Sequence, residues 1–194
     1  MAVNKRILAG SLGAAVLISV GGGYLLSRSN SNDSTEARIT PGTVYSDPNQ
    51  IPTNKVVQGE KLPTVNLVDT QGNTVSTAGL IGHHPLVINI WAVTCEACKI
   101  EMPLLAKVQA DVGDKVDFVG VDTLENTPSA IKFATDKGVK YQLLSDHNGE
   151  LTGALGVTGL PYTLFISANG TIVAQKGIAL DEATIRANVA AISP

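Results

Sequence analysis

The apolar and polar positions of residues 57–194 alternate in a way that predicts a sheet covered by helices. The run LVINIWA at residues 86–92 is almost continuously apolar, which is typical of a central strand buried on both faces. Other short apolar runs bounded by turn residues predict further strands: 116–122, 141–146, and two hairpins at 63–77 and 162–175. The sequence therefore predicts an α/β domain.

Helical periodicity appears between the predicted strands. Ile100, Leu104, Val108 and Val112 recur every four positions up to Gly113, which predicts a helix with this stripe as its buried face. Further helices are expected where apolar residues share one helical face: 128–137, 149–155, and a last helix that starts at Asp181. Helices are therefore expected on both faces of the sheet.

The N-terminal part has a different character. Ile7–Leu26 is an uncharged run long enough to cross a bilayer as a helix of roughly 20 residues. Lys5 and Arg6 precede it, so the positive-inside rule places residues 1–6 in the cytoplasm and the rest outside. A retained signal-anchor is favoured, because the run exceeds the ~7–15 residues of a signal-peptide core. A cleaved signal peptide, which would release a secreted protein, is the alternative.

Composition separates a predicted linker from a globular domain and argues against a nucleic-acid partner. Residues 27–56 are rich in Ser, Asn, Asp and Pro and predict a flexible linker, the alternative being an ordered extension packed on the domain. Residues 57–194 are long enough for one globular domain. The net charge of −3 provides no basic surface for nucleic acid, so no nucleic-acid partner is expected.

The only two cysteines, Cys95 and Cys98, lie directly after the predicted central strand and at the start of a helix. Free N–H groups and the helix dipole favour a thiolate at Cys95. Cys98 follows one helical turn later, close enough to resolve a mixed disulfide. A bridge that closes so short a loop adds little stability, so the pair indicates disulfide exchange rather than a structural role.

The segments INIWAVTCEACKIEMP and GVTGLPYTLFI resemble the thioredoxin superfamily, and more closely its membrane-anchored TlpA/ResA (DsbE-like) branch, over residues 57–194. The resemblance implies a thioredoxin-like fold with a central mixed sheet, an N-terminal β-hairpin and a central αβ insertion near residues 128–145. It further implies a thiol-disulfide oxidoreductase with Cys95 as the attacking thiol and Cys98 as the resolving thiol. Pro161 matches the cis-proline that faces the disulfide and, with Leu160, offers backbone hydrogen bonds to a substrate peptide.

The branch also implies a reaction and its partners. We expect reduction of disulfides in exported proteins, with apocytochrome c as the implied substrate and a membrane thiol-disulfide protein as electron donor. An oxidase that forms disulfides in exported proteins is the alternative. No cofactor is expected.

Three residues near the cysteines have two interpretations each. Thr94 replaces the usual tryptophan and is either a hydrogen-bond donor to the Cys95 thiolate or a solvent-facing turn residue. Trp91 either shields the disulfide or belongs to the core. We assign both to substrate binding. Asn89 stands where cytoplasmic thioredoxins carry a buried aspartate and is expected to satisfy buried backbone groups.

Glu101 lies three residues after Cys98 and therefore on the same helical face. Burial there would raise its pKa and allow it to exchange a proton with Cys98. The TlpA/ResA branch carries an acidic residue at this place, which implies a catalytic role. A solvated charge favoured by the helix dipole is the alternative. Glu96 is expected to face solvent.

Other chemistries on the same scaffold are less well supported. A zinc site would combine the cysteines with His83, His84 or His147, but no His-x-x-x-His spacing is present. A copper-delivery protein of this fold would carry a Cys-x-x-x-Cys motif, whereas the two cysteines of this chain are separated by two residues. A peroxidase would require Thr-x-x-Cys, whereas Thr94 directly precedes Cys95. No metal site is expected.

Overall fold

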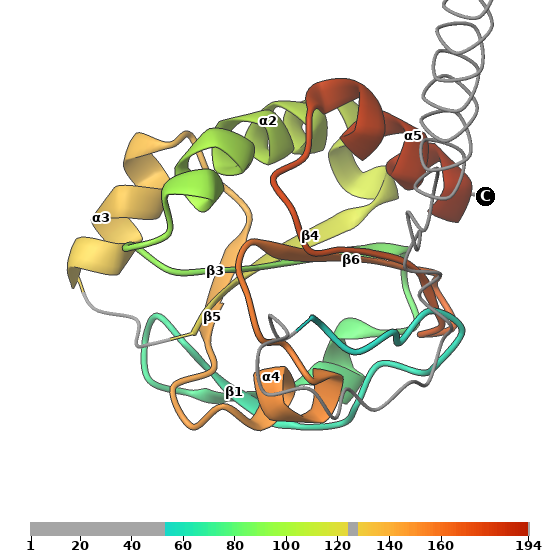
Figure 1. Cartoon of the computed structure of the whole chain (residues 1–194), viewed down its shortest axis with the longest axis horizontal. Coiled ribbons are helices and arrows are strands. Elements are labelled where there is room, and N and C mark those ends of the chain that lie inside the picture. Colours follow the sequence, from blue (N-terminus) through green and yellow to red (C-terminus); the bar gives the residue numbers. More distant parts are fainter. Residues whose placement is uncertain (1–52, 124–127, 194) are drawn as a thin grey trace, which may run out of the picture. The chain divides into compact units, whose positions relative to one another are not determined.

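The computed structural model describes residues 53–123 and 128–193. Within them, seven strands form one sheet in the order β2-β1-β5-β4-β3-β6-β7 (Figure 1). β3 is parallel to β4 and β4 to β5, while the other neighbours are antiparallel, so the predicted mixed sheet is confirmed. The strands are β1 (Asn66–Asp69), β2 (Thr74–Ser76), β3 (Leu86–Trp91), β4 (Asp117–Asp122), β5 (Gln142–Ser145), β6 (Tyr162–Ile166) and β7 (Ile172–Lys176).

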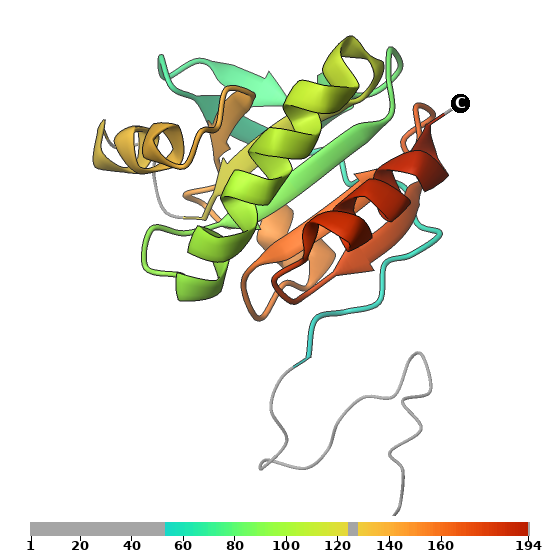
Figure 2. The same cartoon turned by 90° about the horizontal axis from the view of Figure 1, so that it is seen from above.

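Helices cover both faces of this sheet. They are α2 (Glu96–Val112), α3 (Pro128–Asp136), α4 (Glu150–Leu155) and α5 (Glu182–Ile192), with short 3-10 turns η1 (Thr77–Leu80) and η2 (Gly113–Lys115). α2, α3 and α5 lie on one face and α4 on the other (Figure 1). Seen from above, α2 and α5 run side by side over the sheet (Figure 2). The expected two-sided helical cover is confirmed.

The central strand β3 divides the interior into two cores. Its side chains alternate, so Val87 and Trp91 pack under α2, whereas Ile88 and Ile90 pack on the side of α4. All six residues of β3 are buried, as its continuous apolar sequence predicts. This strand leads directly to the cysteines and thereby fixes their place in the fold.

The predicted buried stripe of α2 needs correction. Ile100 is 65% exposed, while the buried positions of the helix are Cys98, Glu101, Met102, Leu105 and Val108. A helix turns about 100° per residue, so an exact four-residue repeat drifts about 40° at each step and leaves the buried face. The true face follows alternating three- and four-residue steps, and it includes Glu101.

The N-terminal hairpin and the central insertion are both present. β1 and β2 pair antiparallel with Leu67 opposite Val75. The insertion consists of α3 and β5, and β5 lies between β4 and β1. The hairpin therefore joins the central strands through the inserted strand, with Val68 opposite Ser145.

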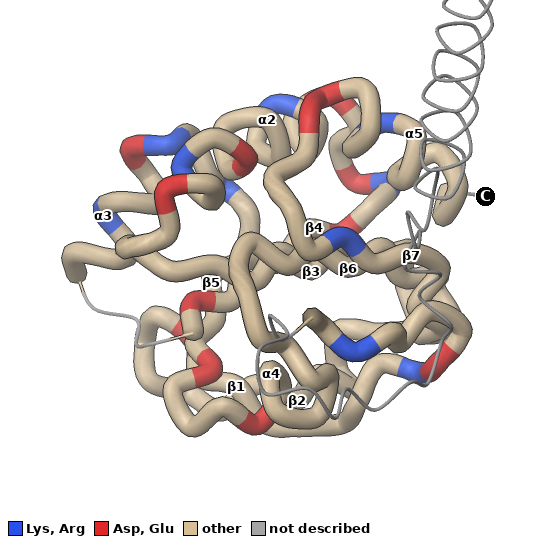
Figure 3. The backbone as a smooth tube through the Cα atoms, in the orientation of Figure 1, with Lys and Arg blue, Asp and Glu red and all other residues tan. Residues whose placement is uncertain are grey.

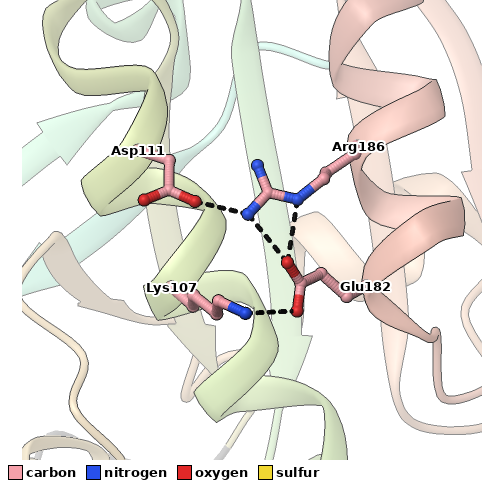
Figure 4. A network of polar contacts seen from close by, with 4 residues as sticks. All are labelled: Lys107, Asp111, Glu182 and Arg186. Atoms are coloured by element: carbon pink, nitrogen blue, oxygen red, sulfur yellow. Dashed lines mark hydrogen bonds and ion pairs between the residues drawn. The ribbon is translucent and has the colours of Figure 1, made fainter.

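Charged side chains connect α2 to α5. Glu182 accepts hydrogen bonds from Lys107 at 2.8 Å and from Arg186 Nε at 2.9 Å, and Arg186 also pairs with Asp111 (Figure 4). Such exposed pairs individually add little stability. Figure 3 shows that acidic and basic residues are interspersed over the face of α2, α3 and α5.

An N-terminal strap, residues 53–62, runs over the domain before the first strand. Its later part lies along β7: Gly59 N donates to Ile172 O at 2.8 Å, and Ile172 N donates to Glu60 O at 2.9 Å. Residues 53–56 belong to the segment predicted as linker, and Asn54 and Lys55 form hydrogen bonds with the domain. The apolar run Ile7–Leu26, the rest of the predicted linker and Thr127 lie outside the described residues.

Within residues 53–123 and 128–193, none of the helices combines the length and apolar character that a membrane crossing requires.

Candidate active site

The two cysteines lie at the junction of β3 and α2. After β3 the chain turns at Ala92, whose carbonyl accepts a hydrogen bond from Cys95 N at 3.0 Å. Cys95 is the N-cap of α2, and its sulfur accepts a hydrogen bond from Cys98 N at 3.1 Å. A sulfur thus occupies the place that a Ser, Thr or Asp oxygen usually takes. In the reduced protein this N–H and the helix dipole stabilise a Cys95 thiolate.

The cysteines form a disulfide, with an S–S distance of 2.04 Å and a Cα–Cα distance of 5.3 Å. Cys95 is partly exposed, whereas Cys98 is completely buried. An external thiol or disulfide can therefore reach Cys95 but not Cys98. This difference in accessibility fits the predicted roles, with Cys95 as the attacking thiol and Cys98 as the resolving thiol.

Leu160 and Pro161 lie at the same edge of the sheet as the disulfide. β6 is antiparallel to β3, with Tyr162 opposite Ile90, so the start of β6 adjoins the end of β3. The Leu160–Pro161 peptide bond is cis, as predicted. Leu160 is half-buried and Pro161 is buried.

Glu101 lies one helical turn beyond Cys98 and is completely buried. Its Oε1 accepts a hydrogen bond from Thr163 Oγ1 at 2.7 Å, while Oε2 has no hydrogen-bond partner among the described residues. Burial raises the pKa of Glu101 to about 7, against the opposing effect of the Thr163 hydrogen bond. A group with this pKa gains and loses a proton near neutral pH, which suits it to proton transfer.

The partner of Glu101 is itself oriented by Asn89. Asn89 Nδ2 donates to Thr163 Oγ1 at 3.0 Å, so the threonine hydroxyl accepts one hydrogen bond and directs its own proton to Glu101. Asn89 therefore binds a side chain and not the backbone groups that we expected. Thr163 was not singled out in the sequence. Its signal was a polar residue inside the apolar strand YTLFI, matching Asn89 inside LVINIW.

Tyr141 is a second residue near Glu101 that sequence reasoning missed. Burial raises its pKa, and the negative charge of Glu101 adds to the effect. Gly120 leaves space for the Tyr141 side chain, because a Cβ at position 120 would lie 3.2 Å from both Tyr141 Cε2 and Trp91 Nε1. An aromatic residue of the insertion, directly before β5, thus lies near the carboxylate.

Two of the predicted substrate-binding residues differ in exposure. Thr94 is exposed beside Cys95. Trp91 is 1% exposed and stacks on Phe133 with ring centroids 5.6 Å apart. Its side chain belongs to the core and offers no surface to a substrate, because both of its faces are covered by protein. The assignment of Trp91 to substrate binding is therefore corrected.

The histidines considered as metal ligands do not converge on the cysteines. His84 lies before β3 and contacts Asp117 at 3.4 Å, and His83 and His147 are exposed. Among residues 53–123 and 128–193, no three His, Cys, Asp or Glu side chains form a group that could hold a metal ion. The zinc alternative gains no support.

Glu96 is exposed and pairs with Lys99, as expected for a solvent-facing residue.

Comparison with known proteins agrees with this geometry. Residues 57–188 match the Redoxin family. The chain is 32% identical over 149 residues to the thiol:disulfide interchange protein DsbE of Pseudomonas fluorescens biotype C, covering 76% of this chain and 81% of that protein. It is 28% identical over 119 residues to the thiol-disulfide oxidoreductase ResA of Bacillus subtilis (strain 168), covering 61% of this chain and 66% of that protein.

The solved structure of MTB DsbF, in mixed oxidized and reduced forms, has a TM-score of 0.61 at 26% sequence identity and covers 67% of this chain and 96% of that one. The thioredoxin-like fold and the redox chemistry of a cysteine pair thus follow from both structure and relatedness. The chain belongs to the Redoxin family and is a thiol-disulfide oxidoreductase of the DsbE and ResA type, with Cys95 and Cys98 as its cysteine pair.

Proposed function

We propose that this protein reduces disulfides in exported proteins outside the cytoplasmic membrane, with apocytochrome c as the substrate. The observation that carries the proposal is Glu101, completely buried one turn beyond Cys98, with a pKa of about 7. A reductant must deprotonate its resolving thiol during each turnover, and a buried carboxylate at this place supplies the base. The name and activity of DsbE and ResA relatives add support.

The proposed reaction moves two electrons from the dithiol to the substrate. The Cys95 thiolate attacks one sulfur of the substrate disulfide, forms a mixed disulfide and releases the first substrate thiolate. Glu101 then takes the proton of Cys98, and the resulting thiolate attacks Cys95 Sγ. The second substrate thiolate leaves, protons from Glu101 and solvent restore both substrate thiols, and the Cys95–Cys98 disulfide remains.

The oxidised protein needs a second dithiol to start another cycle. We propose that a membrane thiol-disulfide protein supplies it by the same exchange in reverse. Ile7–Leu26 then serves as the anchor that keeps the domain beside this donor, with Lys5 and Arg6 on the cytoplasmic side. If the segment is instead cleaved, the same domain acts as a secreted protein.

Measurement of the Cys95/Cys98 reduction potential tests the direction of transfer. A value near that of thioredoxin, about −270 mV, supports a reductant. A value near that of DsbA, about −120 mV, contradicts it and supports the oxidase. The reduced protein should also reduce a disulfide-bonded Cys-x-x-Cys-His peptide, the sequence to which c-type haem attaches.

The oxidase is the second candidate because of one observation at Cys95. The hydrogen bond from Cys98 N to Cys95 Sγ stabilises a thiolate in the reduced form, and stabilising that form raises the potential. Thr94, exposed beside Cys95, is a further hydroxyl that can act in the same direction. The potential therefore decides between the two directions.

A further inference from the structure

The N-terminal strap contacts the loop that precedes the cis-proline. Asn54 Oδ1 accepts three hydrogen bonds from this loop: from Thr158 N at 2.7 Å, Thr158 Oγ1 at 3.2 Å and Gly159 N at 3.1 Å. Lys55 N donates to Gly156 O at 3.2 Å. One side chain, far away in the sequence, thus binds two consecutive backbone N–H groups just before Leu160.

The strap is fixed on its other side by β7. Gln175 Nε2 donates to Lys55 O at 2.7 Å, and Gln175 Oε1 accepts from Val57 N. Asn54 itself packs against Gly177, where an added Cβ would lie 2.5 Å from Asn54 Nδ2. Asn54 is therefore held between the end of β7 and residues 158–159, and it has little freedom to move.

This loop contains two glycines. It starts at Gly156, which has a left-handed φ of 64°, and it contains Gly159, at which an added Cβ would meet no atom within 4 Å. Thr158 and Gly159 are both exposed. Glycine gives the backbone many alternative conformations, so the side chain that binds these two N–H groups restricts them strongly.

The position of this loop matters for the active site because Leu160 and Pro161 follow it directly. They directly precede β6, at the end of the sheet where β3 leads into Cys95. A displacement of Thr158 and Gly159 would therefore move the backbone groups beside the disulfide. The sulfurs, fixed by β3 and α2, would stay in place.

We propose that Asn54 is a positioning residue for substrate peptides, which holds Leu160 and Pro161 where an extended chain can bind beside Cys95. This role rests on the proposed reduction of protein disulfides. It predicts a division of effects: loss of Asn54 weakens binding of a peptide, whereas the chemistry of the cysteines is unchanged. A small disulfide, which does not bind to this loop, measures the reactivity of the cysteines separately from peptide binding.

The test uses Asn54→Ala in the full chain, with a disulfide-bonded Cys-x-x-Cys-His peptide and 2-hydroxyethyl disulfide as substrates. KM for the peptide should rise by about 5- to 30-fold, if disordering of the loop weakens binding by as much as loss of a capping side chain weakens a fold. The rate with 2-hydroxyethyl disulfide should change by less than about twofold. Asn54→Asp retains the acceptor oxygen and should restore the wild-type KM. Asn66→Ala, at an exposed asparagine of β1, is the matched control.

Gly177→Ala provides an independent perturbation, because its Cβ displaces the Asn54 amide without removing it. It should raise the peptide KM in the same way. An unchanged KM in both Asn54→Ala and Gly177→Ala overturns the proposal, as does an equal loss of rate with the small disulfide. If the wild-type protein does not reduce the peptide, the proposed function fails instead. Amide exchange at Thr158 and Gly159 then decides the role of Asn54, since faster exchange in Asn54→Ala supports it and unchanged exchange refutes it.

Discussion

Replacement of Glu101 by glutamine should remove a pH dependence of stability that the buried carboxyl creates. Burial raises the pKa of Glu101 from 4.5 to about 7 in the folded protein. The folded state therefore binds more protons than the unfolded state between these pH values. Stability from this group is fully present below about pH 4.5 and is lost as the pH rises through 7.

The size of the effect follows from the two pKa values. They differ by about 2.5, and each pKa step corresponds to about 1.4 kcal/mol. Full ionisation of Glu101 thus costs about 3 kcal/mol of unfolding free energy, a large part of the total for a domain of this size. Glutamine keeps the acceptor oxygen for Thr163 and carries no charge, so its contribution is constant with pH.

Urea unfolding of the oxidised protein between pH 4.5 and 8.5 measures this difference. Relative to wild type, Glu101→Gln should gain about 3 kcal/mol of unfolding free energy from the low to the high end of the range, with most of the change between pH 4.5 and about 7. The difference between the two proteins isolates Glu101, because all other titrating groups are shared.

Glu96→Gln is the matched control, since Glu96 is exposed in the same helix and should leave the wild-type pH profile nearly unchanged. The reasoning is refuted if wild type and Glu101→Gln have parallel profiles over the whole range. That result would mean that the carboxylate is solvated in the folded protein.

Four further substitutions test other parts of the site and the core. Cys98→Ser should accumulate mixed disulfides with partner proteins and Cys95→Ser should not, as resolved by non-reducing electrophoresis; equal trapping would contradict the assignment of attacking and resolving thiols. Thr163→Val removes a hydrogen bond that lowers the pKa of Glu101, so the loss of stability with rising pH should continue to a pH above about 7 before it levels off, and an unchanged profile would contradict this. Leu105→Ala should cost about 2–5 kcal/mol in urea unfolding, because Leu105 is completely buried on the inner face of α2.

The elements of the fold were predictable wherever one local pattern determined them. β3 is apolar throughout because both of its faces are covered, and Asn169-Gly170 is a turn signal that any hairpin can use. The buried face of α2 was not predictable from apolar residues alone. Two of its positions are Glu101 and Cys98, which apolar periodicity does not count, so the stripe was drawn through the exposed Ile100.

Only the site residues that lie within short sequence motifs were predictable. The cysteines, Glu101 and the cis-proline lie in short segments that resemble a known family. Thr163, Asn89 and Tyr141 act through contacts between residues far apart in the sequence, such as the 2.7 Å hydrogen bond across 62 positions from Thr163 to Glu101. Asn54 was assigned to a linker because its neighbours are polar, and composition does not reveal which loop a single amide will bind.

The N-terminal strap also has a consequence for association of the protein with itself. β7 is the outermost strand on its side of the sheet, and its Ile172 N–H and C=O groups are taken by Glu60 and Gly59. Strand edges with free backbone groups pair with other chains and promote aggregation. Proteolytic removal of residues 53–62 would uncover this part of the edge while leaving both cysteines intact, so such a cut should promote aggregation through β7.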